Sequence, residues 1–138
     1  MTNILNLFKF IESKRKQYHV PLKLILINNL PLPKDDLNVK GNLDLSNTQI
    51  KSLPDNLKIN GSLSAADSPM TELPDNLNVK RDIYISNTPI KSLPNNLKVG
   101  KDLYLSNTPI SKKYTKEEIL KMIEDTGGSV GGEIYSYS

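Results

Sequence analysis

The feature that most constrains this chain is a stretch that repeats itself every 20 residues. The dipeptide Leu-Pro stands at Leu53-Pro54, Leu73-Pro74 and Leu93-Pro94, and an earlier unit without it covers residues 37–50. The other positions that keep this spacing are Leu57, Leu77 and Leu97; Ile59, Val79 and Val99; Leu63, Ile83 and Leu103; Ala65, Ile85 and Leu105; Ser68, Thr88 and Thr108; and Met70, Ile90 and Ile110. A fixed period of this length indicates a solenoid, in which each unit forms one rung of a coil.

Each unit contains a short alternation of apolar and polar residues, which is the pattern of a β-strand. These strands are expected at residues 43–45, 63–65, 83–85 and 103–105. Asn-Thr pairs follow three of them, and their amides and hydroxyls can bond the backbone groups of a turn. The leg that returns to the next strand is short and interrupted by proline, so we expect it to be extended or a 3₁₀ turn. Stacked rungs should pair their strands in parallel and share a column of Leu and Ile.

The stretch Leu43-Asp44-Leu45-Ser46-Asn47-Thr48-Gln49-Ile50 and its three counterparts resemble the leucine-rich repeat family, whose core reads L-x-x-L-x-L-x-x-N/C-x-L. Thr, or Ser in one unit, stands where the family has Asn or Cys, and the family's first Leu is replaced. The residues at that replaced position are Lys40, Asn60, Lys80 and Gly100. We expect the valine or isoleucine one position earlier to make the inward contact instead.

The short period and the Leu-Pro return leg look like the all-β repeats of bacterial effector proteins, and equally like repeat proteins common in tailed-phage genomes. The resemblance implies a non-enzymatic module that binds a protein through its strand face. For a phage protein, it implies an inhibitor or adaptor acting on a host protein in the host cytoplasm. The ubiquitin-ligase domain that often follows effector repeats uses a Cys, and this chain has none.

The C-terminal segment contains one more unit, displaced by 31 residues, since residues 130–135 match residues 99–104. Thr115 and Glu118 form a capping-box pattern, an apolar stripe follows, and Gly127-Gly128 ends it, so a helix fills the extra length. The stripe consists of Ile119, Leu120, Met122 and Ile123. A last strand is expected near residues 133–137.

At the N-terminus, Thr2 could cap a helix that ends near Gln17. This helix would cap the solenoid, or alternatively Phe8 and Phe10 would form a partner-binding face. The stretch from Val20 to Asn28 matches the strand spacing, so we read it as a further rung.

We therefore predict a single domain over residues 1–138, an α/β solenoid in the form of a leucine-rich-repeat-like parallel β coil of about six rungs. Residues 1–19 form the N-terminal capping helix, residues 20–110 the repeats, and residues 111–138 one C-terminal helix-bearing rung that ends in the last strand.

The strand positions that point outward define the candidate binding face. One column is predicted to contain Ile25, Asp44, Ser64, Tyr84, Tyr104 and Tyr135; its neighbour Lys23, Asn42, Ser62, Asp82, Asp102 and Glu133; and a third Ser46, Ala66, Ser86, Ser106 and Tyr137. Parallel strands lie ~4.8 Å apart, so the tyrosines should stack beside a ladder of acids. The candidate protein-binding residues are Tyr84, Tyr104, Tyr135, Asp82, Asp102 and Glu133. The alternative is a stack that only stabilises the sheet. The repulsion among the acids would be relieved by a basic partner or by Arg81, Lys101 and Lys23.

Composition excludes most catalytic chemistry. The chain has no Cys and one His, so it offers no thiol nucleophile, no disulfide and no multi-histidine metal cluster. We read His19 as a boundary residue rather than a ligand, and the acids lie on an open surface where acid–base catalysis lacks a concave site. We expect no enzyme activity, no metal and no cofactor.

The net charge of +3, from 18 basic and 15 acidic residues, disfavours nucleic acid as the main partner. The basic residues read as a solvated rim, and they include Lys14, Arg15, Lys16, Lys51, Lys58, Lys91, Lys98, Lys112, Lys113 and Lys116. No apolar stretch is long enough for a membrane span, and charge follows the apolar N-terminus rather than preceding it, so we expect a cytoplasmic protein.

Two further hypotheses stay open. One is a structural or virion protein that self-associates through the terminal strand edge at residues 135–138, and the other is weak nucleic-acid binding by the basic rim.

Overall fold

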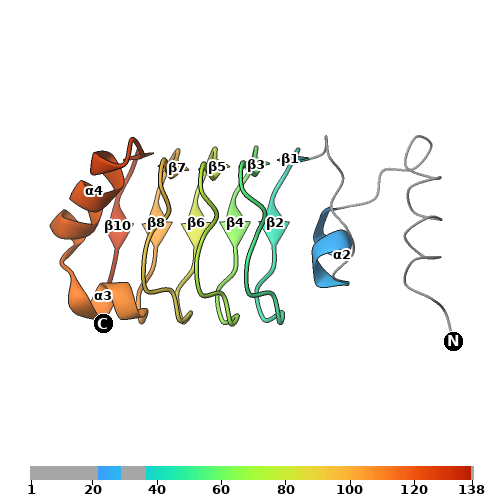
Figure 1. Cartoon of the computed structure of the whole chain (residues 1–138), viewed down its shortest axis with the longest axis horizontal. Coiled ribbons are helices and arrows are strands. Elements are labelled where there is room, and N and C mark those ends of the chain that lie inside the picture. Colours follow the sequence, from blue (N-terminus) through green and yellow to red (C-terminus); the bar gives the residue numbers. More distant parts are fainter. Residues whose placement is uncertain (1–21, 29–36, 138) are drawn as a thin grey trace, which may run out of the picture.

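The computed structural model describes residues 22–28 and 37–137, and within them the chain winds into a parallel β-solenoid (Figure 1). The expected N-terminal cap, with Phe8, Phe10 and His19, lies outside the described residues. Each coil contributes one short strand to each of two five-stranded parallel sheets. Sheet A contains β1 (Asn38–Val39), β3 (Lys58–Ile59), β5 (Asn78–Val79), β7 (Lys98–Val99) and β9 (Ser129–Val130). Sheet B contains β2 (Leu43–Asp44), β4 (Leu63–Ser64), β6 (Ile83–Tyr84), β8 (Leu103–Tyr104) and β10 (Ile134–Tyr135).

The register of both sheets follows the sequence repeat. Leu43 pairs with Leu63, and Leu63 pairs with Ile83, an advance of 20 residues per coil. The last coil advances by 31 residues, so that Leu103 pairs with Ile134. Equivalent side chains therefore stack in columns, and the inward columns of both sheets close over one apolar core that includes the fully buried Met70. The predicted parallel coil is confirmed.

In the three coils from β3 to β8, two corners depend on a residue with positive φ, and the coil of β1 and β2 has one such corner. These residues are Asn47, Asp67, Asn87 and Asn107 after sheet B, and Asn56, Asn76 and Asn96 before sheet A. Asn and Asp tolerate this left-handed conformation better than other side chains. Their amides also bond between coils, as in the 2.8 Å hydrogen bond that Asn76 Nδ2 donates to Asn56 Oδ1. The hydroxyl of the following residue donates to the strand it leaves, for example Thr88 Oγ1 to the Ile85 carbonyl at 2.7 Å. The turn role expected of the Asn-Thr pairs is thus confirmed.

The return leg is extended, which was one of its two expected conformations, and it also contains the strands of sheet A, which the sequence did not indicate. These strands have only two residues each, too few for an alternating pattern to be recognised in the sequence.

The stretch read as a first rung is also different, since Leu22–Ile27 forms helix α2. A strand would bury Leu24, whereas Leu24 is 51% exposed and the buried residues are Leu22 and Ile25, spaced as on a helix. Ile25 and Lys23 are therefore not part of the outward columns. The prediction of a strand here is wrong because a short apolar run fits a helix or a strand equally well.

The last coil carries the helices α3 (Pro109–Lys113) and α4 (Lys116–Asp125), which cover the C-terminal end of the solenoid (Figure 1). Helix α4 confirms the prediction, including the capping box of Thr115 and Glu118 and the buried Ile119. Helix α3 was not anticipated. It forms because no Leu-Pro follows Ile110, so nothing interrupts a helix that Pro109 begins.

None of the helices in the described part of the chain is both long and apolar enough to cross a membrane.

Candidate functional site

The outward face of sheet B brings together all six candidate residues. Tyr84, Tyr104 and Tyr135 occupy one column, paired in register across β6, β8 and β10. Asp82, Asp102 and Glu133 lie two residues before them and form the neighbouring column. The sequence-based grouping of these residues is therefore confirmed, while the role of the group stays a prediction.

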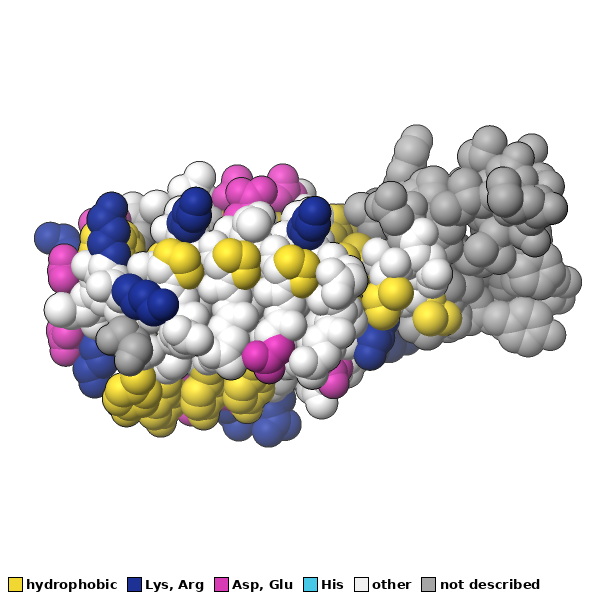
Figure 2. All heavy atoms as spheres, turned by 90° about the horizontal axis from the view of Figure 1, so that it is seen from below, with side chains coloured by type: hydrophobic (Ala, Val, Ile, Leu, Met, Phe, Trp, Pro, Cys, Tyr) yellow, Lys and Arg dark blue, Asp and Glu magenta, His cyan; other side chains and the backbone are white. Residues whose placement is uncertain are grey.

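The three tyrosine rings form a continuous stack along the axis of the solenoid. The ring centroids of Tyr84 and Tyr104 are 4.7 Å apart with 10° between the planes, and those of Tyr104 and Tyr135 are 4.7 Å apart with 8°. Figure 2 shows a continuous band of hydrophobic side chains along one edge of the molecule. Tyr84 is 37% exposed, whereas Tyr104 and Tyr135 are half-buried. The stack thus presents a rigid aromatic surface whose N-terminal end is the most open.

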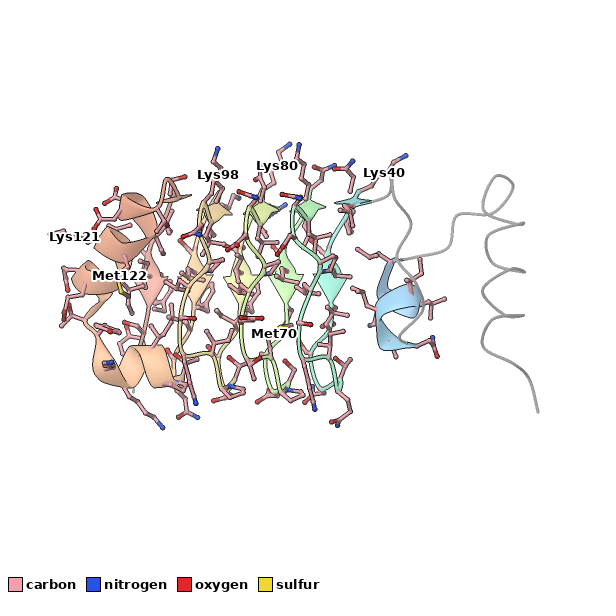
Figure 3. All side chains as sticks on the ribbon, in the orientation of Figure 1. Lys40, Met70, Lys80, Lys98, Lys121 and Met122 are labelled. Atoms are coloured by element: carbon pink, nitrogen blue, oxygen red, sulfur yellow. The ribbon has the colours of Figure 1, made fainter. Side chains whose placement is uncertain are left out.

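Several basic side chains lie away from the tyrosine stack, although Lys116 and Arg81 lie close enough to act on Glu133 and Tyr84. Figure 3 shows Lys40, Lys80 and Lys98 pointing away from the body of the solenoid along one edge, next to sheet A, and Lys121 pointing outward from α4. The outward positions of sheet B carry four carboxylates and no Lys or Arg between residues 42 and 137. The two faces therefore differ in charge, and the aromatic stack lies on the acidic one.

The acidic column has a structural role that its sequence pattern does not reveal. Asp82 Oδ1 accepts a hydrogen bond from the backbone N–H of Asp102 at 3.0 Å, and Asp102 Oδ1 accepts from the N–H of Glu133 at 2.8 Å. Ser62 and Asn42 extend the same chain of bonds into the earlier coils. Ser62 Oγ accepts from the Asp82 N–H, and Asn42 Oδ1 accepts from the Ser62 N–H. We call this column the acceptor spine.

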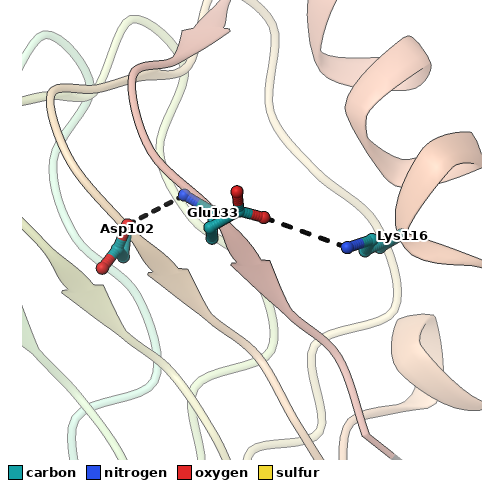
Figure 4. Close-up of polar contacts among 3 residues, drawn as sticks. All are labelled: Asp102, Lys116 and Glu133. Atoms are coloured by element: carbon teal, nitrogen blue, oxygen red, sulfur yellow. Dashed lines mark hydrogen bonds and ion pairs between the residues drawn. The ribbon is translucent and has the colours of Figure 1, made fainter.

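The second oxygen of each aspartate faces the tyrosine stack. Tyr84 and Tyr104 donate their hydroxyls to Asp82 Oδ2 at 3.5 Å and Asp102 Oδ2 at 3.4 Å. Glu133 instead lies 3.9 Å from the ammonium group of Lys116 on α4 (Figure 4). The carboxylates of Asp82 and Asp102 thus accept hydrogen bonds from backbone N–H groups and tyrosine hydroxyls, and Glu133 pairs with Lys116. These contacts offset the repulsion among the acids, a role that was expected of Arg81, Lys101 and Lys23.

The environment of this face shifts three pKa values. Desolvation, followed by the charge of Asp82, raises the pKa of Tyr84, and desolvation with the charge of Asp102 raises the pKa of Tyr104. The backbone N–H of Ser46 lowers the pKa of Asp44. At neutral pH the face therefore combines the uncharged hydroxyls of Tyr84 and Tyr104 with the ionised carboxylate of Asp44, which suits stacking, hydrogen bonding and attraction of cations.

Other features of the described residues offer less for function. Within residues 22–28 and 37–137, no three acidic or histidine side chains are arranged to hold a metal ion. A cavity of about 700 Å³ lies between α2 and residues 48–54, lined by Ile25, Ile27 and Ile50 among others.

Comparison of the chain with protein-family models, with curated proteins and with solved structures gives no match. Its function is therefore inferred from its own residues.

Proposed function

We propose that this protein is a non-enzymatic, leucine-rich-repeat-like module that binds a protein partner through the outward face of sheet B. The binding residues are Tyr84, Tyr104, Tyr135, Asp82, Asp102 and Glu133. For a phage-encoded chain, the partner is a host protein that it inhibits or recruits. The observation that carries the proposal is the tyrosine stack, which keeps a large aromatic surface in contact with solvent.

A stack of this kind suits binding for two reasons. The rings are already held by their neighbours, so little side-chain entropy is lost when a partner covers them. Tyrosine is also among the residues enriched in the energetic centres of interfaces, because it combines an apolar ring with a polar hydroxyl. The resemblance to leucine-rich repeats, which bind partners through their strand face, supports the same surface.

The proposal is tested by affinity capture from an extract of the source cells, with the wild-type chain and a Tyr84→Ser/Tyr104→Ser/Tyr135→Ser variant as baits. We expect a protein that the wild type retains and the variant loses, with direct binding then measured by calorimetry on the purified partner. Recovery of the same proteins by both baits would refute the proposed face.

A matched control carries its substitutions on the opposite sheet, as Lys58→Ala/Asn78→Ala/Lys98→Ala, and should retain the partner. Circular dichroism verifies that both variants keep the fold. Light scattering over a concentration series identifies the alternative in which the face is covered by a second copy of the chain.

A further inference from the structure

The tyrosine stack ends abruptly in the middle of its column. Tyr84 stacks on Tyr104 on one side, and on its other side the paired residue is Ser64. Ser64 has no ring, and its hydroxyl bonds to the hydroxyl of Ser46. One strand spacing of about 4.8 Å beside the Tyr84 ring therefore contains no aromatic group from sheet B. This position beside Tyr84 and above Ser64 is called the open step.

The far end of the stack is different. Tyr135 lies in the last strand of sheet B, and α4 packs against β10 on that side. Tyr84 is correspondingly exposed, whereas Tyr104 and Tyr135 are half-buried. The open step is thus the place where a planar group from outside can continue the stack.

The residues around the open step favour a positively charged group at this position. Asp44 follows Ser64 in the same column, and Asp82 lies beside Tyr84 in the acceptor spine. Asp44 is exposed, and the outward positions of sheet B contain no Lys or Arg. Lys23 on α2 is the basic residue whose charge reaches Asp44, and it makes no ion pair with it among the described residues. A nucleobase would bring phosphates toward carboxylates, whereas a cation is attracted.

We propose that the open step is a seat for an arginine side chain of the protein partner, stacked on the free face of Tyr84 between the carboxylates of Asp44 and Asp82. Arginine fits better than lysine because its guanidinium is planar, stacks on aromatic rings and donates to two acceptors at once. The inference rests on the proposed function, since it names the chemistry that the sheet B face recognises.

The test uses defined probes, the acetylated and amidated peptides GRGRGRG and GKGKGKG and a citrulline analogue of the first. Each is titrated into ¹⁵N-labelled full-length protein and followed by backbone amide shifts. We expect the arginine peptide to shift Ser62, Ser64 and Tyr84 and to bind about two- to fivefold more tightly than the lysine peptide. The citrulline peptide, which has the same shape without the charge, should bind more weakly than both.

The decisive variant is Ser64→Tyr, which fills the open step with a ring of the chain itself. Stacking on Tyr84 lets this variant fold, and its amide spectrum verifies that it does. We expect it to lose the preference for arginine. Equal binding of the arginine and lysine peptides would overturn the seat, as would a preference that survives Ser64→Tyr or shifts confined to other residues. Competition by a single-stranded oligonucleotide at the same amides would also overturn it.

The two proposals fail in different ways. If Ser64→Tyr still captures the cellular partner while the triple tyrosine variant does not, the face is right and the seat is wrong. If neither variant loses a partner, the proposed function is refuted whatever the peptides do.

Discussion

Replacing Thr108 by valine tests how the last coil is held. Thr108 Oγ1 donates to the Leu105 carbonyl at 2.8 Å, as the equivalent hydroxyls do in the earlier coils. It also accepts from the N–H of Ser111 at 3.1 Å, as the N-cap of α3, and Thr108 is completely buried. Valine has nearly the same shape, so Thr108→Val removes both hydrogen bonds and leaves the packing in place.

The matched control is Thr88→Val, because Thr88 is also buried and its hydroxyl makes the corresponding bond to the Ile85 carbonyl. No helix follows Thr88, so this variant loses one hydrogen bond, which contributes about 1 kcal/mol. Thr108→Val loses the same bond and the N-cap, and caps contribute about 0.5–2 kcal/mol. We therefore expect about 1.5–3 kcal/mol for Thr108→Val and about 1 kcal/mol for Thr88→Val.

Urea unfolding followed by far-UV circular dichroism measures both values. With a slope of about 2 kcal/mol per molar urea, the expected difference of about 0.5–2 kcal/mol separates the two midpoints by roughly 0.25–1 M. Equal midpoints at the same slope would refute the reasoning, because they would show that the capping bond of α3 adds nothing to the global stability. A lower slope for Thr108→Val would instead locate the loss in the last coil, which unfolds separately in a protein built from stacked repeats.

Two further predictions concern close packing and pH. A Cβ atom on Gly100 would overlap the carbonyl oxygen of Lys80, so Gly100→Ala should lower the free energy of unfolding by about 1–3 kcal/mol. At Gly41 no atom of the described residues lies within 4 Å of an added Cβ, so Gly41→Ala should change the free energy of unfolding by less than about 0.5 kcal/mol in the same urea experiment. The raised pKa values of Tyr84 and Tyr104 favour the protonated folded state, so their contribution is complete below the ordinary pKa of 10.0 and is lost as the pH rises through the folded-state pKa. The melting temperature should therefore fall more steeply above pH 10 for the wild type than for Tyr84→Phe/Tyr104→Phe; parallel curves would contradict this.

The parts of the fold that the sequence predicts are those that the repeat determines directly. Once residues 20 apart are known to stack, the buried column of Leu63, Ile83 and Leu103 follows, and so does the neighbouring column of tyrosines. The capping box of α4 is similarly local, because Thr115 and Glu118 bond each other's backbone within one turn. These features need no knowledge of the coil's shape.

The remaining features depend on distances that the pattern does not contain. The acceptor spine requires the Asp102 carboxylate to lie against the N–H of Glu133 in the next coil, which follows from the path of the backbone and not from residue type. Helix α2 is favoured by the packing of Leu22 into the solenoid core, whereas its sequence fits a strand equally well. The open step at Ser64 could have been read from the sequence, since the column changes there from small to aromatic residues.

The acceptor spine also indicates which residues of the face are explained by the fold itself and which are better explained by a partner. Two unit charges about 5 Å apart repel by roughly 0.8 kcal/mol in water, the environment of this open face. A hydrogen bond to a charged group contributes about 1.5–3 kcal/mol, and Asp82 and Asp102 each accept one from the next coil. The bonds within the solenoid therefore outweigh the repulsion, and the fold retains these aspartates without help from outside. The free face of Tyr84 has no such internal explanation, because nothing in sheet B stacks on it. Binding by this face should thus depend more strongly on Tyr84 than on Asp82 or Asp102.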